Sequence, residues 1–573
     1  MALVYDRFLK QRLSRRRLLG AAGGTAIGAA GIALVGCGSS GGETPSNGST
    51  PDANETPTIG GIYRTRQANA FPSLSPFGAT ALASSLVFGF ITYDHLWYVP
   101  IDTGEYELML ASNLEVSEPD GQEVIATLNP SVFHDKAPVN GRAVEGQDVV
   151  DSWLAFRDDP FGLGREWLKS IMDVLEAPTT DTVRITQKEP WAWMFGTAGA
   201  GSPASSNILP RETLDMPDLL RDDIIGSGRF FLESHRGGEN LKFRAHPNWR
   251  IPGEPWLGGT DLVFITDYSQ TEAQFRAGGI DNITFQNKLQ ADQMLDQLGD
   301  DKITITGDLD RAYHCLMLKT TVQPFDDPRV RKAIRLAINR EEMIQLVERD
   351  PAGGVLSCIV PPAQKLYALE EDDADFQEYV RHDEEEARSL LEQANFDFDK
   401  EFTILISSPN EELAERAQVL KQQLERVNIK TKIEQQDLLS VWVPRVLIQA
   451  DYEMTLFTHL AYEDPYLPLA FYTSFSPIGP SDPAKGRNSM IFFDDDVDAA
   501  VNAASAELEL EPRIEKVKAA QKVIMEKEGP MINLYASVNF TGRHNWLKGV
   551  ITGRGSYGLF NGRTWIDTAM RGS

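Results

Sequence analysis

Helix and strand signals alternate over residues 310–540, and this pattern restricts the possible folds of the chain more than any other sequence feature. In segment 412–427, apolar residues recur at spacings of four, three, four and three, which places them along one face of a helix. These residues are Leu413, Ala417, Leu420, Leu424 and Val427. Directly afterwards the period becomes two, with Ile429, Thr431 and Ile433 on one side of a strand. A helix that covers a strand in this way is typical of α/β proteins, so we expect an α/β lobe here.

The remaining pattern divides the chain into a strand-rich first part and a helix-rich second part. Helices are expected at 148–157, 329–338, 341–348, 383–394, 497–504 and 514–524. Strands are expected at 59–65, 114–116, 124–128, 183–186, 228–233, 241–245, 262–266 and 531–535. Arg329 and Arg331 are expected to start a helix and to pair with Asp326 or Asp327. Because 573 residues exceed what one hydrophobic core serves, two or more lobes are expected.

The N-terminal segment is typical of an export signal. Arg15 and Arg16 precede an uncharged run from Gly20 to Val35, which is shorter than the ~20 residues of a spanning helix. This resembles a twin-arginine signal, and the following Cys37 resembles the lipidated cysteine of a lipoprotein, although an ordinary signal with a chance cysteine is the alternative. Residues 38–58 are mostly Gly, Ser, Thr, Pro, Asn and Asp, which predicts a flexible tether.

The net charge limits the kinds of molecule that this chain is expected to bind. The chain has 55 Lys and Arg against 83 Asp and Glu, so its net charge of −28 disfavours a nucleic-acid partner. Solubility alone explains such a surface, so the charge does not indicate a cationic ligand.

Cys315 and Cys358 could pair in an oxidising compartment, but two buried free thiols are the preferred interpretation.

No catalytic or metal-binding motif has the context that it needs. A nucleophile-elbow pattern at 38–42 lies in the tether, and a glycine-rich pattern at 553–558 precedes no helix. The eight histidines are scattered, and the acidic run 494–496 is better explained as a helix cap. We therefore expect no enzyme, no cofactor and no metal site, with an exported hydrolase as a minor alternative.

Four groups of segments occur in the order of one known family. They are Leu110–Ser117 with Phe133–Asp135; Gly226–Phe230 with His246–Trp249 and Arg276–Asp281; Pro324–Ile334 with Ala337–Arg340; and Glu384–Phe396 with Glu412–Ile433. Together they resemble the extracellular solute-binding proteins of family 5, the peptide- and nickel-type receptors of ABC transporters. The resemblance covers nearly all of residues 58–573.

The resemblance implies an α/β, two-lobed, periplasmic-binding-protein-like fold of class II, cluster C type, with an extra small inserted domain and a double crossover between the lobes. The expected parts are a signal peptide at 1–36, a linker at 37–57, lobe I at 58–305 with an insertion at about 94–187, lobe II at 306–528, and a C-terminal segment at 529–573 that returns to lobe I. It further implies a monomer, anchored to the outer face of the membrane at Cys37, that captures a solute between its lobes and delivers it to ABC permease subunits. A surface sensor or chaperone-like lipoprotein that uses the same cleft is the alternative.

Two positions depart from the peptide-binding members of the family. There an aspartate three residues before an Asp-Pro pair holds the α-amino group of the ligand, with a tryptophan shortly upstream. Here the pair is Asp464-Pro465, and the two positions hold Ala461 and Thr458. A buried ammonium needs a partner, so a peptide with a free N-terminus is not expected to bind in that way unless Glu463 takes this role.

Aromatic residues and one loop are the candidate ligand contacts, because aromatic rings offer large and stiff contact areas. The candidates are Phe71, Leu74 and Ser75 in a loop, Trp191 and Trp193 on one face of an expected strand, and Tyr462 and Tyr466 on the other lobe. Packing in the core is the alternative for each aromatic. The ligand itself stays open between a peptide, a nickel chelate, an oligosaccharide and an opine.

Overall fold

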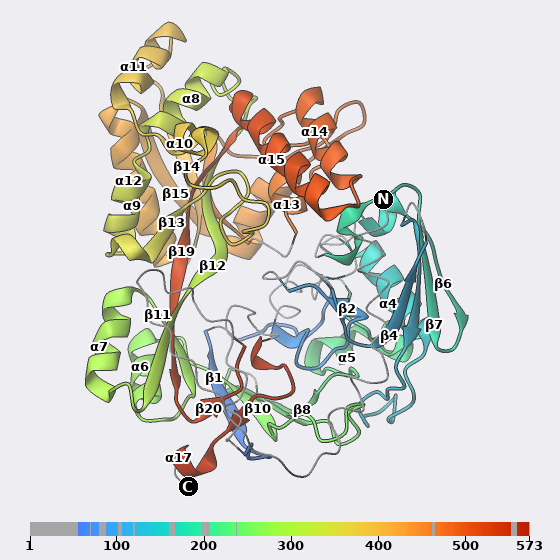
Figure 1. The fold of residues 1–573 in the computed structure, drawn as a ribbon. Helices are drawn as coiled ribbons and strands as arrows, with labels where there is room; N and C mark the ends of the chain where they lie inside the picture. The colour runs from blue at the N-terminus through green and yellow to red at the C-terminus, as the bar shows by residue number, and fades with distance from the viewer. Residues whose placement is uncertain are drawn as a thin grey trace, which may run out of the picture.

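The computed structural model of the protein describes most of the chain after residue 55 (Figure 1). It describes residues 56–571 except 69, 79–86, 101–105, 118–120, 160–166, 197–198, 200, 202–205, 237, 409, 461–463 and 552–557. The predicted signal peptide and tether, with Arg15, Arg16 and Cys37, lie outside these residues, and so do Tyr462 and most of the glycine-rich pattern at 553–558. No helix within the described ranges is long and apolar enough to cross a membrane.

A seven-stranded sheet forms the centre of the molecule. Its order is β11 (Asn282–Phe285), β19 (Met531–His544), β12 (Ile303–Leu318), β16 (Met454–Leu460), β14 (Glu401–Ser408) and β15 (Lys430–Asp437), with β13 (Gly354–Leu356) paired to β19. The β14, β15 and β16 strands are parallel to one another, as the helix–strand alternation predicts, whereas β12 and β19 are antiparallel.

The two long strands of this sheet run through both halves of the molecule (Figure 1). The first half of β12 pairs with the second half of β19, next to β11, and the second half of β12 pairs with β16 and the first half of β19. The register between β12 and β19 shifts between Leu309 and Tyr313. These strands provide the double connection between lobes that the resemblance implies, whereas the exact domain boundaries stay a prediction.

Amphipathic helices cover the upper half of the sheet. They include α8 (Pro328–Ala337), α9 (Arg340–Val347), α10 (Ala374–Val380), α11 (Glu384–Gln393) and α12 (Glu411–Arg426). The predicted face of α12 is buried from Leu413 to Leu424, so the period-based prediction of this helix is confirmed. Beyond them lie α13 (Tyr466–Ala470), α14 (Asp495–Ser505) and α15 (Leu510–Glu526). Short helical segments are η5 (Pro351–Gly353), η6 (Leu438–Trp442) and η7 (Pro444–Ile448).

The lower half contains a second sheet and further helices. Its strand order is β1 (Ile62–Gln67), β10 (Gly259–Phe264), β9 (Asn240–Ala245) and β8 (Phe230–Arg236), and only β1 and β10 are parallel. The helices near it are α5 (Pro217–Asp222), α6 (Tyr268–Arg276), α7 (Lys288–Leu298) and the C-terminal α17 (Thr568–Arg571). Short pairs are β2 (Trp97–Tyr98) with β3 (Glu107–Leu108), β17 (Ser481–Asp482) with β18 (Gly486–Arg487), and β20 (Leu547–Lys548) with β21 (Trp565–Ile566).

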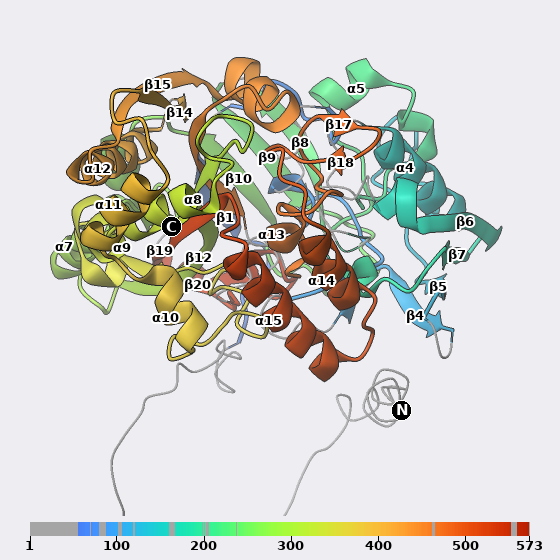
Figure 2. The same cartoon turned by 90° about the horizontal axis from the view of Figure 1, so that it is seen from above.

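A separate antiparallel sheet lies within the segment where an insertion is predicted. Its order is β4 (Ala111–Val116), β5 (Glu123–Leu128), β7 (Thr182–Gln187) and β6 (Met172–Thr179). Helix α4 (Gly146–Asp158) packs on it with Val149, Trp153 and Phe156 buried, as predicted, and η2 (Trp167–Ile171) and η4 (Arg211–Thr213) lie nearby. Figure 2 shows this sheet and α4 on the far side of the molecule from α11 and α12.

Several local predictions are settled by the structure. Cys315 and Cys358 are buried free thiols, so the disulfide alternative is wrong. The Asp494 side chain caps α14. Arg329 pairs with Asp327 at 2.6 Å as expected. Arg331 does not pair with a carboxylate among the described residues. It is buried and donates to the backbone carbonyls of Phe325 and Asp326 before α8 and of Lys527 after α15, because both chain segments direct these oxygens at its guanidinium.

The predicted strand at 531–535 is much longer than its sequence signal. Strand β19 continues through the polar residues Asn539, Thr541 and Arg543 to His544. These residues stay extended because β11 and β12 pair with them on both sides. Tertiary pairing thus overrides weak local propensity here.

Candidate ligand-binding site

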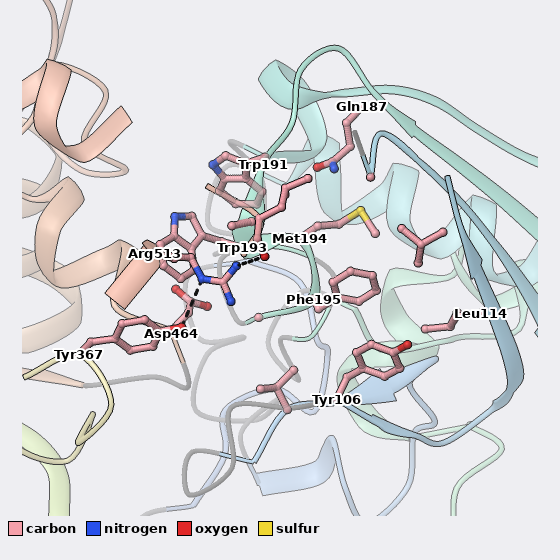
Figure 3. A pocket seen from close by; sticks show the side chains of 16 residues that line it. Tyr106, Leu114, Gln187, Trp191, Trp193, Met194, Phe195, Tyr367, Asp464 and Arg513 are labelled. Carbon is pink, nitrogen blue, oxygen red and sulfur yellow. Dashed lines mark hydrogen bonds between the residues drawn. The ribbon is translucent and has the colours of Figure 1, made fainter. Parts of the chain in front are cut away.

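A hollow opens between the small antiparallel sheet and the segments around α13–α15 (Figure 3). Its empty space, counted out to the open mouth, is about 980 Å³. The sheet-side wall consists of Val99, Tyr106, Leu114, Val116, Gly121, Gln187, Trp191, Ala192, Trp193, Met194, Phe195 and Gly196. The helix-side wall consists of Tyr367, Asp464, Leu508 and Arg513. The hollow is therefore apolar and aromatic on one side and charged on the other.

The two predicted tryptophans lie in the sheet-side wall, but on a different element than expected. After β7 ends at Gln187, Trp191 is the cap of a 3₁₀ helix, η3 (Ala192–Phe195), and Trp193 lies within it. The expected strand is wrong, because Pro190 has no amide for a sheet ladder and the chain then turns back tightly at Gly196. The turn still brings both indoles to the hollow (Figure 3).

Both tryptophans contact the opposite wall. The Nε1 of Trp193 donates a buried hydrogen bond to the Oγ of Ser505, 2.9 Å away at the end of α14. The rings of Trp193 and Tyr367 meet edge to face at 5.9 Å, and those of Trp191 and Tyr466 at 5.2 Å. These contacts join segments more than 170 residues apart, so the structure has its two walls in contact.

Asp464 contributes a buried carboxylate to the helix-side wall. Its Oδ1 accepts from the backbone N–H of Tyr466 at 3.1 Å, and its backbone carbonyl accepts from Nε2 of Gln364 at 2.5 Å. Its Oδ2 lies so close to Gly196 that a Cβ there would be 2.1 Å away. Only a glycine fits beneath this carboxylate, so the two walls also meet at this point.

The predicted loop contacts lie elsewhere. Phe71 packs on Phe88 and Phe264 at ring distances of 4.9 and 6.2 Å, and Leu74 is fully buried in the same core. The Oγ of Ser75 accepts from the backbone N–H of Phe77. None of these three residues is among those that line the hollow, and their part in ligand binding stays a prediction.

The sequence analysis named Asp464 only as part of the Asp464-Pro465 pair, and it did not single out five other polar or aromatic residues of the walls, namely Tyr106, Gln187, Phe195, Tyr367 and Arg513. One signal was available for Arg513, which lies in the first turn of α15. The positive end of the helix dipole disfavours a cation there, so an arginine at this position indicates a role other than stabilising the helix. Tyr106, whose ring stacks on Phe195 at 5.0 Å, carried no comparable signal.

A second polar cluster lies inside the upper half of the molecule. Side-chain ligand atoms of His314, Glu348 and Glu412 lie within 4.8 Å of one another, a spacing that could suit a metal ion. The guanidinium of Arg416 instead lies 3.2 Å from Glu348 and 2.6 Å from Glu412. An added cation would meet this positive charge, so the set does not fit a metal site.

Hydrogen bonds occupy the other groups of this cluster. Glu348 accepts from the hydroxyls of Tyr535 and Ser537 at 2.7 and 3.0 Å. His314 lies 2.9 Å from the hydroxyl of Ser537, and burial lowers its pKa well below the usual range. Burial also raises the pKa of Glu348. The cluster is therefore a structural network that links α9 and α12 to the sheet.

Two lobes joined by paired long strands, with an aromatic hollow among the described residues, are the architecture of a solute-binding receptor. The chain belongs to the bacterial extracellular solute-binding proteins, family 5, whose model matches residues 105–479. This confirms the family that the motifs indicate. Members of the family bind peptides or small solutes outside the cytoplasm and work with ABC transporter permeases.

Characterised relatives differ in what they bind. The glutathione-binding protein GsiB of Salmonella typhi is 26% identical over 373 residues, which are 64% of this chain and 68% of that protein. The heme-binding protein A of Haemophilus influenzae is 26% identical over 423 residues, which are 69% of this chain and 70% of that protein. The ligand is thus not fixed by the family.

Solved structures confirm the fold class. The periplasmic binding protein DppA of Helicobacter pylori, in complex with the peptide STSA, superposes with a TM-score of 0.73 at 21% identity over 89% of this chain and 99% of that chain. AgaA of A. tumefacien R10, in complex with agropinic acid, gives 0.71 at 21% identity, with the same coverage of both chains.

Proposed function

We propose that this protein is an exported lipoprotein, anchored through Cys37, that encloses a peptide or another small solute in the described hollow and delivers it to an ABC permease. The observation that carries this proposal is the pair of walls in direct contact around an aromatic cavity, above all the 2.9 Å bond from Trp193 to Ser505. Closure of this kind buries a ligand and releases its water, and a permease can distinguish the closed form.

The topology supports a hinge that permits such closure. Strands β12 and β19 are the paired long connections, and their register breaks between Leu309 and Tyr313. An interrupted ladder bends more easily than a continuous one, so rotation of the lobes is expected at this level.

Ligand capture is tested by mass spectrometry of small molecules that copurify with the mature protein and are released by mild denaturation. A true ligand, added back, should raise the melting temperature with its concentration, because it binds only the folded state. If no small molecule copurifies, and no pool of peptides, chelates, sugars or opines changes the melting temperature, this proposal is wrong.

Anchoring is tested with the full chain in a bacterial host that modifies lipoproteins. The wild type should take up labelled fatty acid and sediment with membranes, whereas Cys37→Ala should do neither. A variant with Arg15 and Arg16 both changed to Lys should remain inside the cell, since twin-arginine signals require the pair. Equal labelling of the wild type and Cys37→Ala would contradict the anchor.

A further inference from the structure

The guanidinium of Arg513 is held rigidly at the edge of the hollow. Its Nη1 donates to the backbone carbonyls of Glu507 and Leu508 at 3.2 and 3.0 Å, and its Nε donates to the hydroxyl of Tyr367 at 3.4 Å. The group also lies over the ring of Trp193, with 5.4 Å between its Cζ and the ring centroid. Three hydrogen bonds and one stacking contact thus fix its direction.

This cation has no anionic partner among the described residues, although the chain is rich in carboxylates. Arg513 forms no ion pair and its Nη2 makes no hydrogen bond with any residue that the structure describes. The nearby Asp464 is directed instead at Gly196 and the amide of Tyr466. Figure 3 shows the guanidinium reaching into the space between the walls. The remaining N–H₂ group is therefore available to a ligand.

The rest of the hollow is mainly apolar. Leu114, Val116, Met194 and Phe195 line the sheet-side wall opposite Arg513. Asp464 is the only carboxylate among the described lining residues, and its Oδ1 accepts from the amide of Tyr466. An oriented cation beside an apolar surface attracts an anion, since little water remains to screen the pair. Because Nε and Nη1 are occupied, the Nη2 amino group is the donor that remains, and it can form a charged hydrogen bond to a carboxylate oxygen.

We propose that Arg513 binds a carboxylate of the transported solute, and that the solute is an apolar carboxylic acid whose body lies against the sheet-side wall. An N-blocked apolar peptide with a free C-terminus meets this description, and so does a non-peptide aromatic or aliphatic acid. The inference rests on the proposed function, because it assigns the ligand class to the same hollow.

The test compares three pools of compounds. The acid pool holds aromatic and aliphatic monocarboxylic acids with N-acetylated dipeptides and tripeptides of apolar residues. The amide pool holds the same compounds as carboxamides, and the third pool holds neutral oligosaccharides and amines without a carboxylate. Native mass spectrometry identifies the bound compounds, and the shift in melting temperature ranks their binding.

The wild type should bind members of the acid pool about ten-fold or more tightly than their amides, as expected for a charged hydrogen bond. Arg513→Gln should lose this preference. Arg513→Lys, which keeps the charge but loses the fixed direction of the guanidinium, should retain part of the preference and serves if the glutamine variant does not fold. Lys518→Gln removes one positive charge from the same helix outside the lining and should bind like the wild type.

The remaining outcomes distinguish a failure of the role of Arg513 from a failure of the ligand class or of the proposed function. Equal binding of acids and amides, or an unchanged preference in Arg513→Gln, would refute the role of Arg513. Binding from the third pool only would refute the ligand class and leave the proposed function intact. Binding from none of the three pools would refute the ligand class, and the proposed function would be wrong as well if pools of free peptides, chelates and opines also left the melting temperature unchanged.

Discussion

Replacing Tyr535 with phenylalanine should cost the upper half of the molecule about 3 kcal/mol of unfolding free energy. The hydroxyl of Tyr535 donates to Glu348 at 2.7 Å and accepts from Nε of Arg416 at 2.9 Å, and all three side chains are buried. A hydrogen bond to a charged group contributes roughly 1.5–3 kcal/mol. Both charged partners keep other contacts, so the lower end of this range applies to each bond.

A matched control lies on the same sheet region. Tyr452 is also buried, but its hydroxyl makes one neutral hydrogen bond, to the carbonyl of Ser489 at 3.0 Å. Tyr452→Phe removes the same atom from a similar depth and should cost about 1 kcal/mol. The difference between the two variants therefore isolates the effect of the charged partners.

Urea unfolding, followed by near-ultraviolet circular dichroism at pH 7, measures both variants against the wild type. Tyr535 lies in β19, and Tyr452 precedes β16 of the same sheet by two residues, so we expect one transition to report on both. Equal losses for the two variants would refute the reasoning, and so would a loss below about 1 kcal/mol for Tyr535→Phe.

Three further predictions concern other buried groups. Burial raises the pKa of the Cys358 thiol to about 12 and raises that of Cys315 further. Iodoacetamide at pH 8 should therefore label neither of these two thiols in the folded protein and both of them in urea. Rapid labelling of either thiol in the folded protein would be inconsistent with this structure. Burial lowers the pKa of His95 from 6.5 to about 4, so the unfolded chain binds a proton in this window while the folded chain does not. The free energy of unfolding should therefore fall as the pH drops from 6.5 towards 4, by about 1.4 kcal/mol per pH unit for this group. His95→Asn should make the plot of unfolding free energy against pH less steep in this range. An unchanged slope of this plot would show that His95 contributes nothing. Trp193→Phe keeps an aromatic ring but removes the N–H that donates to Ser505, which weakens the contact between the two walls. The affinity for a bound solute should therefore fall about five-fold or more, because the closed form is less stable. An unchanged ligand-induced shift in melting temperature would show that Trp193 is not part of the site.

Periodic segments were predictable from the sequence because their pattern and their burial have the same cause. The face of α12 and the face of α4 are apolar since each packs on a sheet, and the sequence displays that spacing directly. The second half of β19 could not be recognised in this way, because its extended form depends on β11 and β12, which lie far away in the sequence.

The candidate site was predictable only in part. Aromatic residues close to a proline identified Trp191 and Trp193, but their 3₁₀ turn depends on the tight path at Gly196 under Asp464. Phe71 is as aromatic as they are and lies in the core. Arg513 reaches the hollow from a helix more than 300 residues away from the tryptophans, and no local pattern encodes such a meeting.

The late position of β19 in the chain has a consequence for biosynthesis. This strand, Met531–His544, is the shared neighbour of β11, β12 and β13, so neither half of the central sheet is complete until the ribosome has made almost the whole polypeptide. Nascent chains must keep two unfinished sheet edges away from other molecules until this last strand is added. Premature termination before residue 531 would consequently disable both lobes at once, rather than only the C-terminal end.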